Sequence, residues 1–292
     1  MMIRLPTAML LPRSRRRHYR GLRLTVHILV IAVGLVMIYP LLWMLSSSFK
    51  PTSLIFSQPG VWSGVWILSN YTSGWVALGV SFAQFFSNSL VVALLSVVGN
   101  LLSCSLAAYA FARLRFRFKR VFFGIMLGTI MLPFNVVIVP QYIMFHALQF
   151  INTFYPLILP KFLAVDSFFV FLMVQFIRGL PRELDEAAEI DGCGPFGVFW
   201  RIHLPLMRPV LAVTAVFTFI WSWNDFFVPL LYLTDQQVFT VPVALRAFLD
   251  STGQSEWGPM FAMSILSLIP IFGVFLFAQR QLVRGIATTG IK

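Results

Sequence analysis

The residues with the most concentrated chemistry lie in one segment, residues 181–205, which we call the acid-rich loop. It holds five of the ten acidic residues of the chain, namely Glu183, Asp185, Glu186, Glu189 and Asp191. Acids at this density suit pairing with basic groups on another protein, which gives orientation more than affinity. A loop that rests on a membrane surface would instead be basic, to meet anionic lipid. The segment is therefore predicted to dock on a partner.

The acid-rich loop has the pattern of two short helices joined by a turn. Pro181 suits the first position of a helix, and the acids after it suit the positive end of the helix dipole. One face of this helix, by i, i+3, i+4 spacing, carries Leu184, Ala187 and Ala188. Gly192 can adopt a positive φ and end the helix, Pro195 can begin the next one, and Pro205 breaks the pattern. The second helix is expected to carry an amphipathic stripe of Phe196, Phe199, Trp200 and His203.

A second set of candidates consists of polar residues inside otherwise apolar stretches, namely Asn100, Asp166, Asn224 and Asp225. Polar groups are costly in lipid and usually face a cavity or another helix. Amides and carboxylates beside Trp221 and Trp223 would suit a neutral, hydroxyl-rich ligand, so these residues are predicted to line a substrate pathway. Hydrogen bonding between helices is an equal alternative for each of them.

Motifs for catalysis are missing from the sequence. It contains no G-x-x-x-x-G-K-[ST] phosphate loop, no H-E-x-x-H zinc motif and no G-x-S-x-G nucleophile turn. Cys104 and Cys193 fit neither a metal-ligand spacing nor a disulfide framework. We therefore predict no catalytic residue, no metal ligand and no cofactor.

The composition indicates a protein surrounded by lipid. Of its 292 residues, 59% are hydrophobic and only 11% are charged, whereas soluble domains carry about 25% charged residues. Six spans of roughly membrane-crossing length are predicted: Thr25–Leu45, Ser89–Ala110, Val121–Val139, Leu157–Phe176, Pro209–Leu230 and Met260–Leu282. They divide the chain into a basic tail (1–24), a first transmembrane helix (25–45), a core (85–282) that includes the acid-rich loop, and a second tail (283–292).

The basic residues set the expected orientation. Only Lys50, Lys161 and Arg246 of the 22 basic residues lie outside the segments expected on the cytoplasmic side. This bias follows the positive-inside rule, and it places both termini in the cytoplasm. It also explains the net charge of +12 without nucleic acid, for which no basic surface outside the spans is predicted.

At this point the sequence resembles a known family. Glu186, Ala187 and Ala188, then Gly192, then Ile202 with Leu204 and Pro205 match the EAA loop of ATP-binding-cassette (ABC) import permeases across its fixed positions. Further segments are similar to the maltose-transporter small permease and its carbohydrate-uptake relatives, namely 223–226, 240–242 and 283–292. The resemblance covers most of residues 40–292.

The resemblance implies an all-α integral membrane protein with six transmembrane helices and the type I ABC importer permease fold, in the inner membrane of a bacterium or archaeon. It implies that the seven matched residues form a coupling helix on a cytoplasmic ATPase. The expected partners are a second permease subunit in a heterodimer, two ATPase subunits, an extracytoplasmic solute-binding protein, the lipid bilayer and a sugar. The chain itself would hydrolyse no ATP.

Two other functions stay open at the level of the residues. A secondary transporter driven by an ion gradient would need acidic groups near the midplane and often has repeated halves, and the sequence offers few such acids and no clear repeat. A membrane enzyme or receptor is the third alternative. Within the import family, the transported solute is not determined by the sequence.

Overall fold

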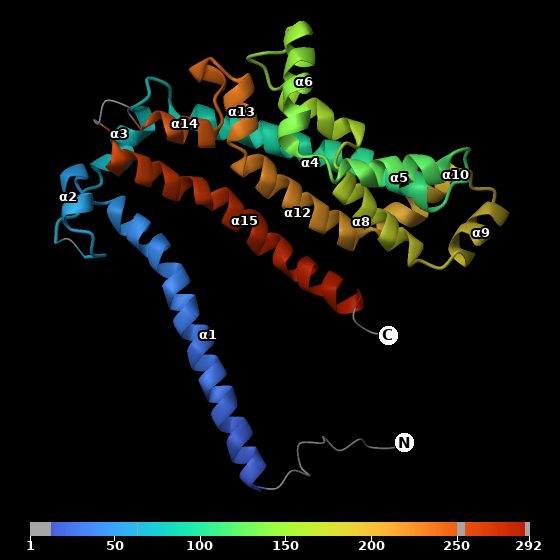
Figure 1. Cartoon of the computed structure of the whole chain (residues 1–292), viewed down its shortest axis with the longest axis horizontal. Helices are drawn as coiled ribbons and strands as arrows, with labels where there is room; N and C mark the ends of the chain where they lie inside the picture. Colours follow the sequence, from blue (N-terminus) through green and yellow to red (C-terminus); the bar gives the residue numbers. More distant parts are fainter. Residues whose placement is uncertain (1–12, 63, 250–254, 290–292) are drawn as a thin grey trace.

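The computed structural model describes residues 13–62, 64–249 and 255–289, and in these ranges it contains helices and no strand. Figure 1 shows an elongated bundle from which α1 leaves at an angle. The α-helices are α1 (Arg13–Ser47), α2 (Thr52–Ser57), α3 (Ser69–Val76), α4 (Phe82–Ala112), α5 (Lys119–Thr129), α6 (Phe134–Ala147), α7 (Tyr155–Ile158), α8 (Ser167–Arg178), α9 (Glu183–Ile190), α10 (Pro195–Val198), α11 (Leu204–Leu206), α12 (Arg208–Asn224), α13 (Phe227–Tyr232), α14 (Val241–Ala247) and α15 (Trp257–Thr289). Shorter 3₁₀ and π segments are η2 (Leu159–Leu163), η3 (Phe199–His203) and η4 (Gln236–Val238).

The helices agree with the predicted membrane spans in number and approximate position. Among the residues that the structure describes, four stretches are long and apolar enough to cross a bilayer, namely Thr25–Ser47, Phe82–Ala112, Tyr155–Arg178 and Trp257–Gln279. Two bent pairs pass the same criteria together, namely α5 with α6 and Pro195–Leu206 with α12, which gives up to six spans. The predicted tails at 1–24 and 283–292 fall partly or wholly outside the residues whose side chains are described.

The central helix of the bundle is α4, which packs against α8, η2 and α12. Its sequence explains this position, because its buried face is rich in small and polar side chains, including Ser89, Ser96, Gly99, Asn100 and Ser105. Small residues let helices approach closely in lipid, and amide or hydroxyl groups can hydrogen-bond between helices. Because this face is buried against three other segments, α4 is in contact with the rest of the bundle along its length.

The tightest contact of α4 is at Gly99. A Cβ atom built there would lie 2.6 Å from the Phe162 ring and 3.1 Å from the Lys161 backbone. We expect Gly99→Ala to lower stability by about 1–3 kcal/mol, the usual cost of overpacking, measured as thermal unfolding in detergent. Gly124→Ala is the matched control, since nothing lies within 4 Å of that position. A Gly99 variant as stable as the Gly124 variant would contradict this packing.

The third predicted span, Val121–Val139, is not one straight helix. It is split into α5 and α6, which meet at 101°. The cause is local, because Pro133 is in an extended conformation and directly precedes α6, and proline disfavours helical geometry in the residue before it. The fourth span is also interrupted, since α7, η2 and α8 are separated at Ala164, which has φ of 53°.

The fifth predicted span, Pro209–Leu230, ends earlier than expected. Helix α12 stops at Asn224 because Asp225 is extended, and α13 then begins at Phe227. No residue from Thr25 to Leu45 is buried by the rest of the chain, whereas Ser46 and Ser47 at the end of α1 are buried. Figure 1 shows α1 diverging from the bundle.

Candidate coupling loop and central cavity

The acid-rich loop begins with α9 and ends that helix in a Schellman motif. Gly192 has φ of 80°, as its position in the sequence predicted. Its N–H donates to the Glu189 carbonyl at 3.0 Å, and the Cys193 N–H donates to the Ala188 carbonyl at 2.9 Å. These are the two hydrogen bonds that define the motif, and the left-handed residue at its centre is usually glycine.

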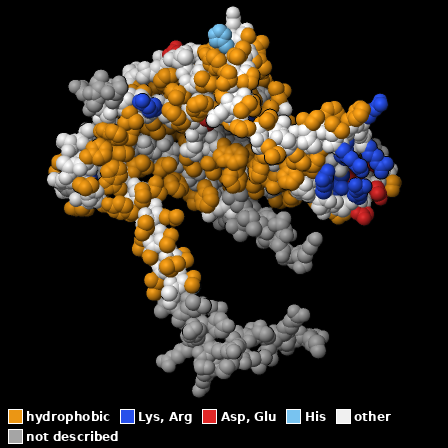
Figure 2. Space-filling view, in the orientation of Figure 1, with side chains coloured by type: hydrophobic (Ala, Val, Ile, Leu, Met, Phe, Trp, Pro, Cys, Tyr) orange, Lys and Arg blue, Asp and Glu red, His pale blue; other side chains and the backbone are white. Residues whose placement is uncertain are grey.

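The exposed side of the loop combines acids with apolar side chains. Glu186 and Ala187 are exposed, and so is Gly192. Beside them Ile190 is 87% exposed and Phe196 is 66% exposed. Figure 2 shows charged side chains of both signs gathered at the end of the molecule where Figure 1 places α9 and α10. The other matched residues lie further in, since Ala188 is buried and Ile202 and Leu204 are half-buried, while Pro205 is exposed.

The second half of the loop differs from the predicted single amphipathic helix. It consists of α10, the π-helical segment η3 and α11, and it meets α12 at 76°. The expected stripe is consequently divided, because Phe199 and His203 are buried whereas Phe196 and Trp200 are exposed. A π-helical turn is closed by a hydrogen bond between residues i and i+5, so it rotates side chains away from the i, i+3, i+4 pattern on which the prediction relied.

The group that holds the loop in place was not among the predicted site residues. The Asp185 carboxylate lies 2.9 Å from Arg113 Nε through Oδ2 and 2.6 Å from His203 Nε2 through Oδ1. We call these three residues the Asp185 junction. A signal was present in the sequence, since Asp185 precedes the buried Ala188 by three positions and so shares its face of α9. The predicted face of Leu184, Ala187 and Ala188 is buried only at Ala188.

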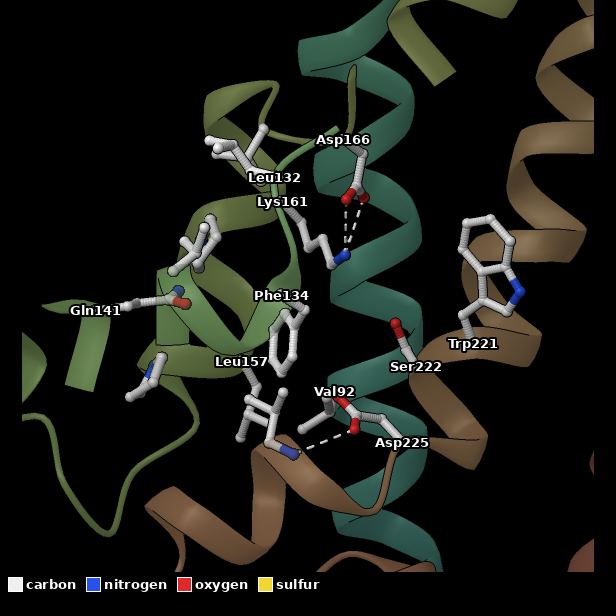
Figure 3. Close-up of a pocket in the computed structure, with 15 residues that line it drawn as sticks. Val92, Leu132, Phe134, Gln141, Leu157, Lys161, Asp166, Trp221, Ser222 and Asp225 are labelled. Carbon is white, nitrogen blue, oxygen red and sulfur yellow. Dashed lines mark hydrogen bonds and ion pairs between the residues drawn. The ribbon is translucent and has the colours of Figure 1, made fainter. Parts of the chain in front are cut away.

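The second candidate site is a cavity of about 440 Å³ between α4, the α5–α6 break, the segment 156–166 and the end of α12. Figure 3 shows its polar wall, on which Lys161 and Asp166 point toward one another and Asp225 lies further along the same wall. The remaining polar lining groups are Gln141 and Ser222, and Trp221 supplies an aromatic face. We call this space the central cavity.

Two of the four predicted pathway residues meet in one network. Asn100 is fully buried, and its Nδ2 donates to Asp166 Oδ2 at 2.5 Å and to Thr218 Oγ1 at 3.0 Å. Lys161 Nζ lies 2.9 Å from the same Asp166 oxygen. The network joins α4, η2, the start of α8 and α12. It explains why an ion pair is tolerated here, because each charge has a partner of opposite sign or an amide.

The other two predicted pathway residues behave differently from each other. Asp225 lines the central cavity, and its Oδ1 accepts a hydrogen bond from the Val228 N–H at 3.2 Å, so it also caps α13. Asn224 does not line the cavity, and its Nδ2 donates to the Ile220 carbonyl of its own helix at 2.9 Å. Of the two adjacent polar residues, only Asp225 therefore faces the enclosed space.

Comparison with known proteins identifies the family. Residues 99–288 match the family described as binding-protein-dependent transport system inner membrane component. The chain is 34% identical to the probable ABC transporter permease protein YurM of Bacillus subtilis, over 96% of this chain and 92% of that protein. It is 33% identical to the arabinooligosaccharides transport system permease protein AraQ of Halalkalibacterium halodurans, over 89% of this chain and 93% of that protein.

Two further comparisons agree. The sn-glycerol-3-phosphate transport system permease protein UgpE of Yersinia enterocolitica is 34% identical, over 91% of this chain and 96% of that protein. A bacterial ABC transporter involved in the import of the acidic polysaccharide alginate has the same fold, with a TM-score of 0.79 over 93% of this chain and 98% of that chain, at 22% identity. These matches support an importer subunit over an ion-gradient transporter. The chain belongs to the binding-protein-dependent transport system inner membrane components, the multi-pass permease subunits of ABC importers.

Proposed function

We propose that this chain forms half of the pathway of a sugar or oligosaccharide importer and transmits ATP-driven motion to it through the acid-rich loop. It pairs with a second permease subunit, two cytoplasmic ATPase subunits and an extracytoplasmic solute-binding protein. The chain is non-catalytic, and its partners hydrolyse the ATP. Both of its termini are cytoplasmic. The loaded binding protein and ATP favour the outward-open state of the transporter, and ATP hydrolysis restores its inward-open state. Each step shifts the populations of these two states.

The observation that carries this proposal is the exposed tip of the acid-rich loop. Ile190 and Phe196 project from a surface that also exposes Glu186 and Ala187. An apolar side chain that is 87% exposed at the charged end of a membrane protein is unfavourable in water, so burial in a partner would stabilise it. The small side chain of Ala187 permits close approach, and the acids set orientation by pairing with basic groups.

We expect Ile190→Lys to weaken binding of the ATPase subunits at least tenfold while the chain still inserts in the membrane. Losing a buried apolar anchor costs about 1.5–3 kcal/mol, and an unpaired ammonium adds to this cost. The measurement is co-purification of the ATPase with the tagged permease, with a binding titration in nanodiscs. Leu68→Lys is the matched control, because Leu68 is 71% exposed but lies between the first two predicted spans, on the side opposite to the predicted cytoplasmic segments. Unchanged ATPase binding by the Ile190 variant would contradict the docking surface.

The chemistry of the central cavity supports a polyhydroxylated solute. Its wall offers carboxylates, an ammonium group, an amide and a hydroxyl beside the exposed ring of Trp221. Such groups exchange hydrogen bonds with sugar hydroxyls, and the ring provides an apolar face. One relative points the same way, since AraQ is a permease of an arabinooligosaccharide transport system. We therefore propose Asp166 and Asp225 as pathway residues, with Asn100 holding Asp166 by a hydrogen bond. Asn224 stays a prediction, because it does not line the central cavity.

A further inference from the structure

Helix α9 is attached to the rest of the chain at few places. Of its eight residues only Ala188 is buried, and it packs in the apolar cluster that includes Tyr109 and Val198. Its ends continue into exposed segments at Pro181 and Gly192. A helix held only in this way could rock on its neighbours when a partner pushes on it. Rigid transmission of force therefore needs a second tie on the inner face of α9.

The Asp185 junction provides that tie and joins three parts of the chain. Arg113 directly follows α4 and also donates from Nη2 to the Leu180 carbonyl at 2.7 Å, just before the loop begins. His203 lies in η3, at the entry to α12, and its ring packs 5.0 Å from that of Tyr109 on α4. One carboxylate consequently connects α9, the end of α4 and the segment leading into α12.

The junction is nearly excluded from water. The exposed fraction of the side chain is 7% for Arg113, 16% for Asp185 and 0% for His203. The contact between His203 and Asp185 is a short hydrogen bond at 2.6 Å to a charged acceptor, and the contact between Arg113 and Asp185 is an ion pair at 2.9 Å. Separating Arg113 from Asp185 would leave a desolvated charge without compensation. The junction should thus resist relative motion of its three segments better than the apolar contacts around it.

Helix α4 leads from the junction to the central cavity without interruption. It is one helix from Phe82 to Ala112, and about 20 Å of it, at 1.5 Å per residue, separates Arg113 from Asn100. Asn100 binds Asp166 on the cavity wall, and Val92 lines the cavity itself. A displacement of the Arg113 end is therefore carried along a rigid rod to the wall.

We propose that Asp185 is a positioning residue that locks the acid-rich loop to α4, so that loop and cavity wall move as one body when the ATPase subunits open and close. This proposal rests on the docking role of the loop given above. In this proposal Asp185 lies on the inner side of the loop, away from the ATPase. Its contacts with Arg113 and His203 make the pathway helices move when the docked loop moves. Glu186 and Ile190 bind the motor, and Asp185 connects them to the permease.

A reversible covalent link tests the proposal in the assembled transporter. In a chain with Cys104→Ala and Cys193→Ala, the pair Arg113→Cys and Asp185→Cys is joined by a short bis-methanethiosulfonate reagent in proteoliposomes that contain the whole complex. We expect solute transported per ATP to be near normal while the link is present and to fall at least tenfold after reduction. The same sample serves before and after, so misfolding does not explain a reversible loss. Loss of transport in the linked state, or equal transport in both states, would overturn the proposal.

Substitutions provide an independent arm. We expect Arg113→Gln and Asp185→Asn each to lower transport per ATP while ATPase binding stays intact, and the double variant to be no worse than either single one. Arg115→Gln is the matched control, since Arg115 is an exposed arginine two positions along. Additive losses in the double variant would count against a shared junction. If the unsubstituted complex does not bind the ATPase through the loop, the docking role itself is wrong. ATPase binding therefore tests the docking role, and transport per ATP tests the role of Asp185.

Discussion

Replacing Gly192 by proline should abolish ATP-coupled transport while the chain still inserts in the membrane at its normal level. Gly192 has φ of 80°, whereas the proline ring fixes φ near −65°. Proline also lacks the N–H that donates to the Glu189 carbonyl. The Schellman motif is therefore lost, and the docking tip from Ile190 to Phe196 is turned in another direction. The measurement is solute uptake and ATP hydrolysis in proteoliposomes that contain the complex.

Two other variants distinguish the effect of the backbone conformation at Gly192 from the effect of replacing any glycine in the loop. Gly192→Ala should give an intermediate loss, because the left-handed conformation costs a residue with a Cβ roughly 1–2 kcal/mol. Gly194→Ala should transport normally, since Gly194 has φ of −71° and nothing lies within 4 Å of its Cβ position. Normal coupled transport by the Gly192→Pro variant would show that the loop does not work as proposed.

Replacing Asp166 by alanine is the second change with a large expected effect. It leaves the Lys161 ammonium and the Asn100 amide without their shared partner. Because both charged side chains are about one quarter exposed, we expect a loss of about 1–3 kcal/mol in the free energy of unfolding, less than the 3–5 kcal/mol typical of a fully buried pair. Solute uptake should fall to background. Thermal unfolding in detergent and uptake into vesicles measure the two effects.

A double substitution distinguishes a structural from a ligand-facing role. Combining Lys161→Met with Asp166→Asn removes both charges, so the stability should return to near its normal value. Uptake should stay low, because the wall of the central cavity has lost the charges at positions 161 and 166. Gln175→Ala, at an exposed polar position on the same helix as Asp166, should change stability by less than about 0.5 kcal/mol. If the double variant recovers full uptake, Lys161 and Asp166 hold helices together and do not contact the solute.

Features encoded in short stretches of sequence were predictable. The spans follow from runs of apolar residues, because each helix must satisfy its own backbone in lipid. The turn at Gly192 follows from one residue that tolerates a positive φ. The third span was predicted as one stretch, and neither its break at Pro133 nor the angle of 101° between α5 and α6 was predicted.

Features that depend on distant residues were not predictable from one sequence. Asp185 and Arg113 are 72 positions apart, and no local pattern pairs them. The network of Asn100, Lys161, Asp166 and Thr218 likewise needs four segments placed in three dimensions. The sequence marked Asn100 and Asp166 as costly in lipid, and the structure adds that they are partners. The same argument explains why Asn224 and Asp225, adjacent in sequence, face different surroundings.

The break between α5 and α6 has a consequence for hydration. At the start of α6 the first main-chain N–H groups lack carbonyl partners within the helix, and hydrocarbon cannot replace them. Leu132 and Phe134, on either side of the break, both line the central cavity, so water that entered this space would be the available partner of these N–H groups. We expect such water to reach this depth of the bilayer, so that an electric potential across the membrane would fall over a layer thinner than the lipid itself.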